Sequence, residues 1–170
     1  KVAIVTGAGS GIGRGCALMF ARHGARVVGA DLDEQGAVET LALARAEGLE
    51  IESLHPLDLT RPDDVQRLMA HAVQRHGGID ILVNAAAWCA FDFIEQLDYE
   101  RDWKRTLVGE LDIVFLACQA VWPHMKARGG GAIVNVASVN AYMAHPVAGA
   151  LAHCAGKGGV MAMTRQLASE

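Results

Sequence analysis

The sequence predicts an α/β fold: a doubly wound parallel sheet with strand order 3-2-1-4-5, enclosed by helices in three α/β/α layers. Short apolar runs alternate with longer amphipathic stretches, which is typical of βαβ units. A glycine-rich turn separates the first apolar run from the first amphipathic stretch. With 170 residues, of which 52% are hydrophobic and 20% charged, the chain has enough apolar material for one sizeable core.

The first half of the chain supplies three strands and three helices. Strands are expected at Val2–Thr6, Arg26–Asp31 and Leu49–His55, and helices at Ile12–His23, Gln35–Glu47 and Pro62 to about His76. Gly24 and Gly48 follow the first two helices, where glycine commonly closes a helix. Thr60 is expected to cap the third helix, because a threonine just before a first-turn proline is a frequent start signal.

The second half continues the alternation. A strand at Ile79–Asn84 is apolar throughout and is therefore predicted to be central. It is followed by a loop over Ala85–Leu97, a long helix over Tyr99–Arg128, a strand at Ala132–Ala137, an irregular stretch holding Pro146 and a helix over Ala150–Ser169. The helical pattern is unfinished at Glu170. We therefore expect residues 1–170 to form a single nucleotide-binding domain whose natural sequence continues further.

Composition excludes several functional classes. A net charge of −4 without a basic cluster argues against nucleic-acid binding. No apolar run reaches the roughly 20 residues of a membrane span, and no signal segment opens the chain. Cys16, Cys89, Cys118 and Cys154 are scattered, which favours reduced thiols and a cytoplasmic location. The histidines lack zinc-motif spacing, so no metal site is predicted.

The glycine-rich turn carries the strongest functional signal. The run from Thr6 to Gly13 lies between a strand and a helix, where glycine lets the backbone approach a pyrophosphate at the helix N-terminus. Asp31 ends the second strand, at the distance expected of a carboxylate that binds the adenosine ribose. These features predict a Rossmann fold that binds NAD rather than NADP, through Gly7, Ser10, Gly11, Ile12, Gly13, Asp31 and its neighbour Leu32.

At this point the sequence resembles the classical short-chain dehydrogenase/reductase family. The Thr-Gly-x-x-x-Gly-x-Gly pattern is similar to its cofactor signature, and Asp58-Leu59-Thr60 to its adenine-binding segment. The run Val134–Ser138 resembles the strand that ends in the catalytic serine, and Lys157 the lysine of the Tyr-x-x-x-Lys motif. The resemblance adds to the predicted cofactor contacts Asp58, Leu59, Asn84, Ala85, Ala86 and Lys157.

Three features of the sequence depart from the family pattern. The tyrosine of Tyr-x-x-x-Lys is replaced by His153, and the asparagine of the long helix by Glu110. The usual Asn-Asn-Ala-Gly segment reads Asn84-Ala85-Ala86-Ala87. The spacing from Ser138 to His153 is also slightly longer, which indicates a small insertion around Tyr142–Ala150.

The resemblance implies a catalytic set of Ser138, His153, Lys157 and Glu110. In the family, the tyrosine exchanges a proton with the substrate oxygen, the serine hydrogen-bonds that oxygen, and the lysine holds the nicotinamide ribose. A neutral imidazole can serve as a general base near neutral pH, so His153 is predicted to replace the tyrosine. The predicted function is an NAD-dependent oxidoreductase that interconverts an alcohol and a ketone or aldehyde. Glu110 either faces Lys157 or is a solvated surface residue.

Other interpretations stay open at the level of sequence. Loss of the tyrosine and the asparagine also fits a non-catalytic NAD-binding protein, and Tyr142 could be the proton donor instead. Trp88, Phe91 and Phe93 could line a substrate pocket or serve as packing. The two long helices of the second half carry apolar residues on several sides, which favours a homodimer or homotetramer.

Overall fold

Five strands form one sheet in the computed structural model, which describes residues 1–144 and 147–170. The strands are β1 (Val2–Thr6), β2 (Arg26–Ala30), β3 (Ile51–Leu54), β4 (Ile81–Asn84) and β5 (Ala132–Asn135), and their order is β3-β2-β1-β4-β5. Strand β1 runs parallel to β2 and β4, and β2 runs parallel to β3. The predicted fold class and strand order are confirmed. Pro146, in the predicted irregular stretch, lies outside the described residues.

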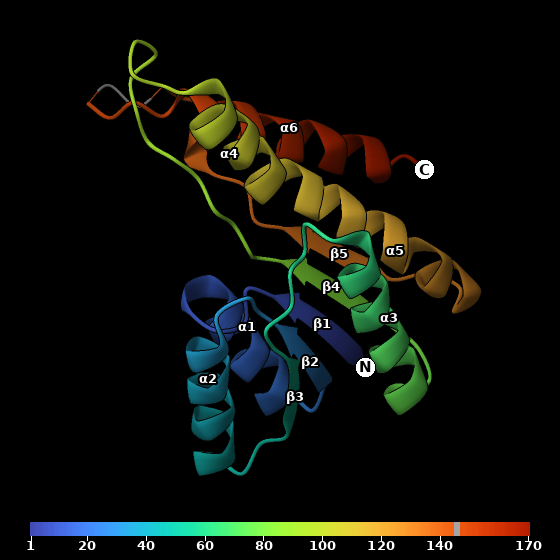
Figure 1. Cartoon of the computed structure of the whole chain (residues 1–170). Coiled ribbons are helices and arrows are strands. Elements are labelled where there is room, and N and C mark those ends of the chain that lie inside the picture. Colours follow the sequence, from blue (N-terminus) through green and yellow to red (C-terminus); the bar gives the residue numbers. More distant parts are fainter. Residues whose placement is uncertain (145–146) are drawn as a thin grey trace. The chain divides into compact units, whose positions relative to one another are not determined.

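The helices of the first half lie close to their predicted bounds: α1 (Gly11–Arg22), α2 (Glu34–Ala46) and α3 (Pro62–His76). Figure 1 shows α1 and α2 on one side of the sheet and α3 on the other, as a doubly wound topology requires. The start of α3 differs in detail from the prediction. Arg61 is its N-terminal flanking residue, and Thr60 instead donates its hydroxyl to Asp58 Oδ1 at 2.7 Å.

The long helix of the second half is not uniformly α-helical. It consists of a π-helical segment η1 (Tyr99–Lys104), α4 (Arg105–Leu107), a second π-helical segment η2 (Val108–Asp112) and α5 (Ile113–Ala127). After β5 come a 3₁₀ turn η3 (Val139–Ala141) and α6 (Leu151–Leu167). Strand β5 ends at Asn135, so Ser138 lies beyond the strand, at the start of η3, and not at the strand end.

The part of the core between the sheet and α1 is built from small side chains. Ala3, Val5, Val27 and Val83 from the strands pack with Ala8, Ala17 and Ala21 from the glycine-rich turn and α1. Alanines on the inner face of α1 let the helix axis come close to the sheet, because each presents only one methyl group. That close approach brings the first turn of α1 to the carboxyl end of β1.

The chain divides into two compact units. The first comprises residues 1–86 and 116–134 and contains the glycine-rich turn; the second comprises residues 87–115 and 135–170 and contains the altered catalytic positions. Among the described residues, one continuous helix, Tyr99–Ala127, is long and apolar enough to meet a length-and-composition test for a membrane span. Core helices of soluble proteins meet the same test, so this helix does not by itself indicate a membrane protein.

Candidate active site

The glycine-rich turn leads from β1 into α1. Ser10 is the flanking residue of α1 in extended conformation, and among the described residues no side chain caps this helix start. Its first turn contains Gly11, Ile12 and Gly13 and no acidic residue. The free N–H groups and positive end of the helix dipole therefore face a site suited to an anion such as a pyrophosphate.

Two glycines of this turn are required by close packing. A Cβ on Gly13 would lie 2.0 Å from the carbonyl oxygen of Gly7, and one on Gly7 would lie 2.7 Å from the backbone nitrogen of Ala86. Gly11 differs, because its φ is +50° and nothing lies within 4 Å of its Cβ position. The turn thus packs tightly on the protein side and is open at Gly11, where a ligand can approach the backbone.

Asp31 follows β2 and holds the turn in place. Its Oδ2 accepts a hydrogen bond from the Gly9 backbone N–H at 2.7 Å, and its Oδ1 accepts one from the Asp33 N–H at 2.8 Å. A carboxylate has about four acceptor positions, so two backbone bonds leave capacity for ribose hydroxyls. Asp31 is therefore a structural residue of the turn in addition to a candidate ribose ligand, and the exposed Leu32 follows it.

The other predicted cofactor positions, apart from Lys157 in α6, follow β3 or end β4 in the same unit. Asp58 and Leu59 lie in the loop before α3, where Asp58 Oδ1 accepts hydrogen bonds from the backbone and the hydroxyl of Thr60. Asn84 ends β4 and is buried. The backbone N–H groups of Ala85 and Ala86 donate to the Thr6 hydroxyl oxygen at 3.1 and 3.2 Å, which fixes the end of β4 to the end of β1.

In the second unit, three side chains form a continuous hydrogen-bonded chain. His153 in α6 has its Nε2 3.2 Å from Ser138 Oγ and its Nδ1 2.7 Å from Glu110 Oε1. An ionised carboxylate cannot donate, so for a neutral ring Nδ1 carries the proton and donates to Glu110. Nε2 is then an acceptor, and the Ser138 hydroxyl donates to it. Each group in the chain therefore has a defined donor or acceptor role.

Glu110 lies in the π-helical segment η2 and is 1% exposed. Its other oxygen, Oε2, has no hydrogen-bond partner among the described residues. A Cβ on Gly156 of α6 would lie 2.8 Å from this Oε2, so α6 needs a glycine opposite the carboxylate. Single π-helical turns are frequent at functional sites. A buried, incompletely satisfied carboxylate stabilises a positive charge that develops on the adjacent imidazole.

Lys157 lies one turn after His153 in α6 and is 5% exposed. Its ammonium donates to the carbonyl oxygen of Val136 at 3.0 Å and lies 3.9 Å from Glu110 Oε1. The structure thus brings together Ser138, His153, Glu110 and Lys157. It places Glu110 inside this cluster and not on a solvated face.

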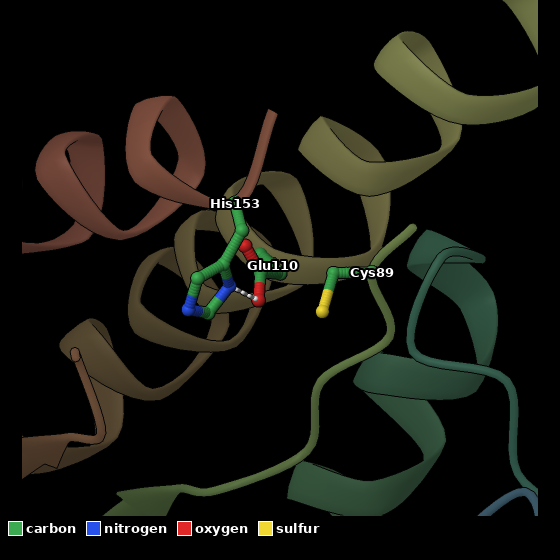
Figure 2. A group of neighbouring side chains, drawn as sticks. All are labelled: Cys89, Glu110 and His153. Carbon is green, nitrogen blue, oxygen red and sulfur yellow. Dashed lines mark hydrogen bonds and ion pairs between the residues drawn. The ribbon is translucent and has the colours of Figure 1, made fainter. Parts of the chain in front are cut away.

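Cys89 was not singled out as a site residue in the sequence, yet it borders the same cluster. Burial raises the pKa of its thiol to about 11, and the Glu110 carboxylate beside it adds to the shift. The ligand atoms of Cys89, Glu110 and His153 lie within 4.8 Å of one another (Figure 2), a group that could hold a metal ion. The Nδ1–Oε1 distance is that of a hydrogen bond, so an ion would have to displace the Nδ1 proton and the thiol proton.

Of the aromatic residues in the loop after β4, Phe91 packs against this cluster. The Phe91 ring packs against the His153 ring with centroids 5.3 Å apart, which restricts rotation of the imidazole. Trp88 instead stacks with the Arg105 guanidinium, and Phe93 is 55% exposed. Tyr142, the alternative proton donor, is 75% exposed and lines a cavity of about 540 Å³ with Asn140, Met143, Leu151 and Cys154.

Sequence reasoning missed three contributors to the cluster: Cys89, Phe91 as a partner of His153, and Gly156. The first two come from the loop after β4, where no periodicity indicates which side chains turn inward. A signal did exist for Gly156, because a glycine in a helix interior costs about 1 kcal/mol relative to alanine and commonly marks close packing.

Comparison with known proteins matches residues 1–170 to the family described as short chain dehydrogenase. The chain belongs to the short-chain dehydrogenase family. It is 40% identical over 170 residues to a D-threitol dehydrogenase of Mycolicibacterium smegmatis, of which it covers 64%. It is 35% identical over 174 residues to a D-beta-hydroxybutyrate dehydrogenase of Rhizobium meliloti, of which it covers 65%. In both cases the alignment spans the whole of this chain.

Solved structures of the family have the same fold. The apo form of LigO from Sphingobium sp. strain SYK-6 superposes with a TM-score of 0.94 at 30% identity, covering 100% of this chain and 62% of that one. The chain therefore spans a little under two thirds of the length of these relatives. The relatives named here are oxidoreductases, and the family uses nicotinamide cofactors generally.

The glycine-rich turn fits such a cofactor on its own geometry. The start of α1 offers backbone N–H groups, Gly11 leaves the approach open, and Asp31 presents a carboxylate at the end of β2. When bound, a nicotinamide cofactor supplies a hydride acceptor or donor. The proton that accompanies the hydride must be handled by side chains of the protein.

Proposed function

We propose that this chain belongs to an NAD-dependent oxidoreductase that interconverts an alcohol and a ketone or aldehyde by hydride transfer, with His153 as the acid/base in place of tyrosine. The observation that carries the proposal is the hydrogen-bonded chain from Ser138 through His153 to Glu110. In a neutral ring that carries its proton on Nδ1, Nε2 is unprotonated and lies within hydrogen-bond distance of the serine hydroxyl. A general base must have such an acceptor within hydrogen-bond reach of the proton it takes.

The proton can reach His153 through Ser138. An imidazole is shorter in reach than a tyrosine, but the Ser138 hydroxyl is already bonded to Nε2 at 3.2 Å. In oxidation, a substrate hydroxyl passes its proton to Ser138 Oγ as the serine passes its own to Nε2. In reduction the two transfers reverse. The relay removes the need for direct contact between the imidazole and the substrate oxygen.

Glu110 acts in this proposal as a positioning residue. It holds the Nδ1 proton and stabilises the imidazolium that forms when Nε2 is protonated. The proposed role of Lys157 follows from the family pattern, in which this lysine binds the nicotinamide ribose. The Asp31 carboxylate would repel a 2′-phosphate, which favours NAD over NADP.

The relatives suggest the substrate class. Two of them are named as dehydrogenases of D-threitol and of D-beta-hydroxybutyrate, so we propose a small polyol or hydroxy acid. We also propose a cytoplasmic homodimer or homotetramer that associates through the long helices of the second half. Phe115 of α5 and Leu151 of α6, which are 48% and 44% exposed, support such an interface. Light scattering of the full-length protein tests it, and a monomer at micromolar concentration would refute it.

The catalytic proposal is tested with the full-length protein, NAD and a panel of polyols and hydroxy acids that includes D-threitol and D-3-hydroxybutyrate. The His153→Ala variant should lower kcat by about 10²–10⁴-fold, the usual contribution of general acid–base catalysis. NAD affinity, measured by calorimetry, should stay within about two-fold, because only an interaction with the reacting groups is removed. Tyr142→Phe is the matched control and should retain full turnover.

Two outcomes would overturn this assignment. Unchanged turnover in His153→Ala with loss in Tyr142→Phe would transfer the acid/base role to Tyr142. Normal NAD binding without turnover on any panel member would favour a non-catalytic NAD-binding protein.

A further inference from the structure

The side chains of Ser138, His153 and Glu110 have the connectivity of a nucleophile, a base and an orienting acid. The serine hydroxyl donates to Nε2, and Nδ1 donates to the carboxylate, over distances of 3.2 and 2.7 Å. Serine nucleophiles in acyl transfer are activated by this arrangement, which occurs on unrelated folds and is recognised by geometry and not by sequence order.

The backbone around Ser138 fixes its hydroxyl in a position that suits a nucleophile. Ser138 precedes η3 in extended conformation, and its Oγ accepts a hydrogen bond from the Asn140 N–H at 3.2 Å. That N–H occupies an acceptor position of the oxygen, so the hydroxyl hydrogen remains for Nε2. The same N–H stabilises negative charge on Oγ as the proton leaves.

The three hydrogen-bonded side chains differ in burial, and acyl transfer requires a shielded carboxylate and an accessible nucleophile. Glu110 is 1% exposed and the His153 side chain 12%, whereas Ser138 is half-buried. The orienting carboxylate is thus shielded from water and the nucleophile is accessible. The segments that carry Ser138 and His153 also build the cavity of about 540 Å³, whose wall includes Tyr142, Met143 and Leu151.

We propose that this cluster has a second activity, the hydrolysis of activated carboxylic esters and thioesters through an acyl-Ser138 intermediate. The proposal uses the same residues as the proposed oxidoreductase but needs no nicotinamide cofactor. Its rate gain comes from activation of the nucleophile, so substrates with good leaving groups are the class expected.

The reaction balances without any further reactant except water. Ser138 Oγ forms a bond to the acyl carbon while its proton moves to His153 Nε2. The carbon–leaving-group bond then breaks, and the leaving group takes that proton from Nε2. Water next attacks the acyl-serine, gives a proton to Nε2 and forms the carboxylic acid, and Ser138 regains its proton as the acyl–oxygen bond breaks.

A second serine–histidine pair in the chain provides an internal comparison. Ser53 Oγ lies 3.1 Å from Nδ1 of His55 in the first unit. No carboxylate bonds to the His55 ring among the described residues, so this pair lacks the orienting group. The proposal therefore predicts acylation at Ser138 and none at Ser53.

The test uses p-nitrophenyl acetate as substrate and a fluorophosphonate as active-site label, on the full-length protein without NAD and with EDTA present. Expected results are release of p-nitrophenolate above the uncatalysed rate and a covalent mass increase on the peptide containing Ser138. Ser138→Ala should abolish both, and Glu110→Gln should lower the rate on the order of 10²–10⁴-fold, as removal of a triad carboxylate does. Ser53→Ala should change neither.

An acyl group found on Lys157 or Cys89, or no labelling of any serine in the unmodified protein, would overturn the proposal. Hydrolysis that disappears with EDTA would assign it to a metal ion at Cys89, Glu110 and His153 instead. Mass analysis of the unmodified protein needs no variant to fold. NADH formation measured on the same preparation separates the two activities, because ester hydrolysis can fail while dehydrogenation persists, and the reverse.

Discussion

The glycine-rich turn of the first unit and the polar cluster of the second unit are built in opposite ways. The turn is one continuous segment, residues 7–13, which is held by backbone contacts and by one carboxylate, Asp31. The cluster joins side chains that lie 43 and 15 residues apart and depends on how η2, η3 and α6 pack. The turn retains the family pattern, and the cluster departs from it. A motif within one continuous segment keeps its pattern as a unit, whereas a cluster assembled by tertiary packing can change its chemistry side chain by side chain.

Each region contains a glycine whose Cβ position is blocked by neighbouring atoms. The same helix carries a second glycine whose Cβ position has no atom within 4 Å. The largest effect is expected for Gly13→Ala in α1, whose Cβ would meet backbone at 2.0 Å. The turn must move, so NAD affinity should fall by about 100-fold or more, with overpacking costing about 1–3 kcal/mol of stability.

Gly15→Ala in the same helix, where nothing lies within 4 Å of the Cβ position, is the control. This variant should bind NAD normally and be more stable by about 0.5–1 kcal/mol. Calorimetry with thermal melts measures both, and equal behaviour of the two variants would contradict the packing account.

The corresponding pair in the polar cluster is Gly156 and Gly158 of α6. Gly156→Ala places a methyl group 2.8 Å from Glu110 Oε2 and should displace the carboxylate from His153, lowering kcat by roughly 10-fold or more, as small misplacements of catalytic groups do. NAD affinity should not change. Gly158→Ala meets no atom within 4 Å and should keep the wild-type kcat. Steady-state kinetics of both variants decide the matter; loss of NAD binding in Gly156→Ala would show that the two regions are not separable.

Asp31 tests how far the turn is specific for NAD. Asp31→Ala removes the charge that repels a 2′-phosphate and should shift relative affinity toward NADP by about 10-fold, a coupling of about 1.4 kcal/mol. It also removes acceptors for the N–H groups of Gly9 and Asp33, so stability should fall. Asp31→Asn retains acceptors and separates the two effects. Tighter NADP than NAD binding in the unmodified protein would refute the NAD assignment.

The last expected effect concerns stability alone, at the amino end of the sheet. A hydrogen bond from the Val2 backbone lowers the pKa of Asp80, and the charges of Arg128 and Lys1 add to the shift. A lowered carboxyl pKa stabilises the folded state above the ordinary pKa, and this contribution is lost as pH falls through the folded value. Asp80→Asn should therefore cost about 1–3 kcal/mol at pH 7 and progressively less below pH 4. Urea unfolding across pH measures it, with the exposed Glu50→Gln as control; a constant deficit at all pH values would exclude the charge as cause.

These contrasts also explain how much the sequence could predict. Val2–Thr6 and the glycine turn are fixed by local rules, so the bounds of β1 are confirmed, and the sheet order followed from the alternation of elements. The other four strands are one to three residues shorter than predicted. The positions of Ser138, His153 and Lys157 in the sequence came through the resemblance. The contacts of Cys89 and Phe91 could not be predicted, because an irregular loop carries no periodic signal. The π-helical turn at Glu110 could not be predicted either, because its side-chain pattern is that of an ordinary α-helix. The sequence predicts Thr60 as the cap of α3, because it does not show that the Thr60 hydroxyl forms a hydrogen bond with Asp58 instead.

The central claim is that Glu110 holds the proton of His153 on Nδ1 and leaves Nε2 free to act as a base. Nitrogen NMR of the full-length protein with labelled histidine measures this directly, because protonated and unprotonated ring nitrogens give separate signals. At a pH where the ring is neutral, His153 should show a protonated Nδ1 and an unprotonated Nε2, and Glu110→Gln should weaken that preference. A His153 ring protonated on Nε2 in the unmodified protein would contradict the account.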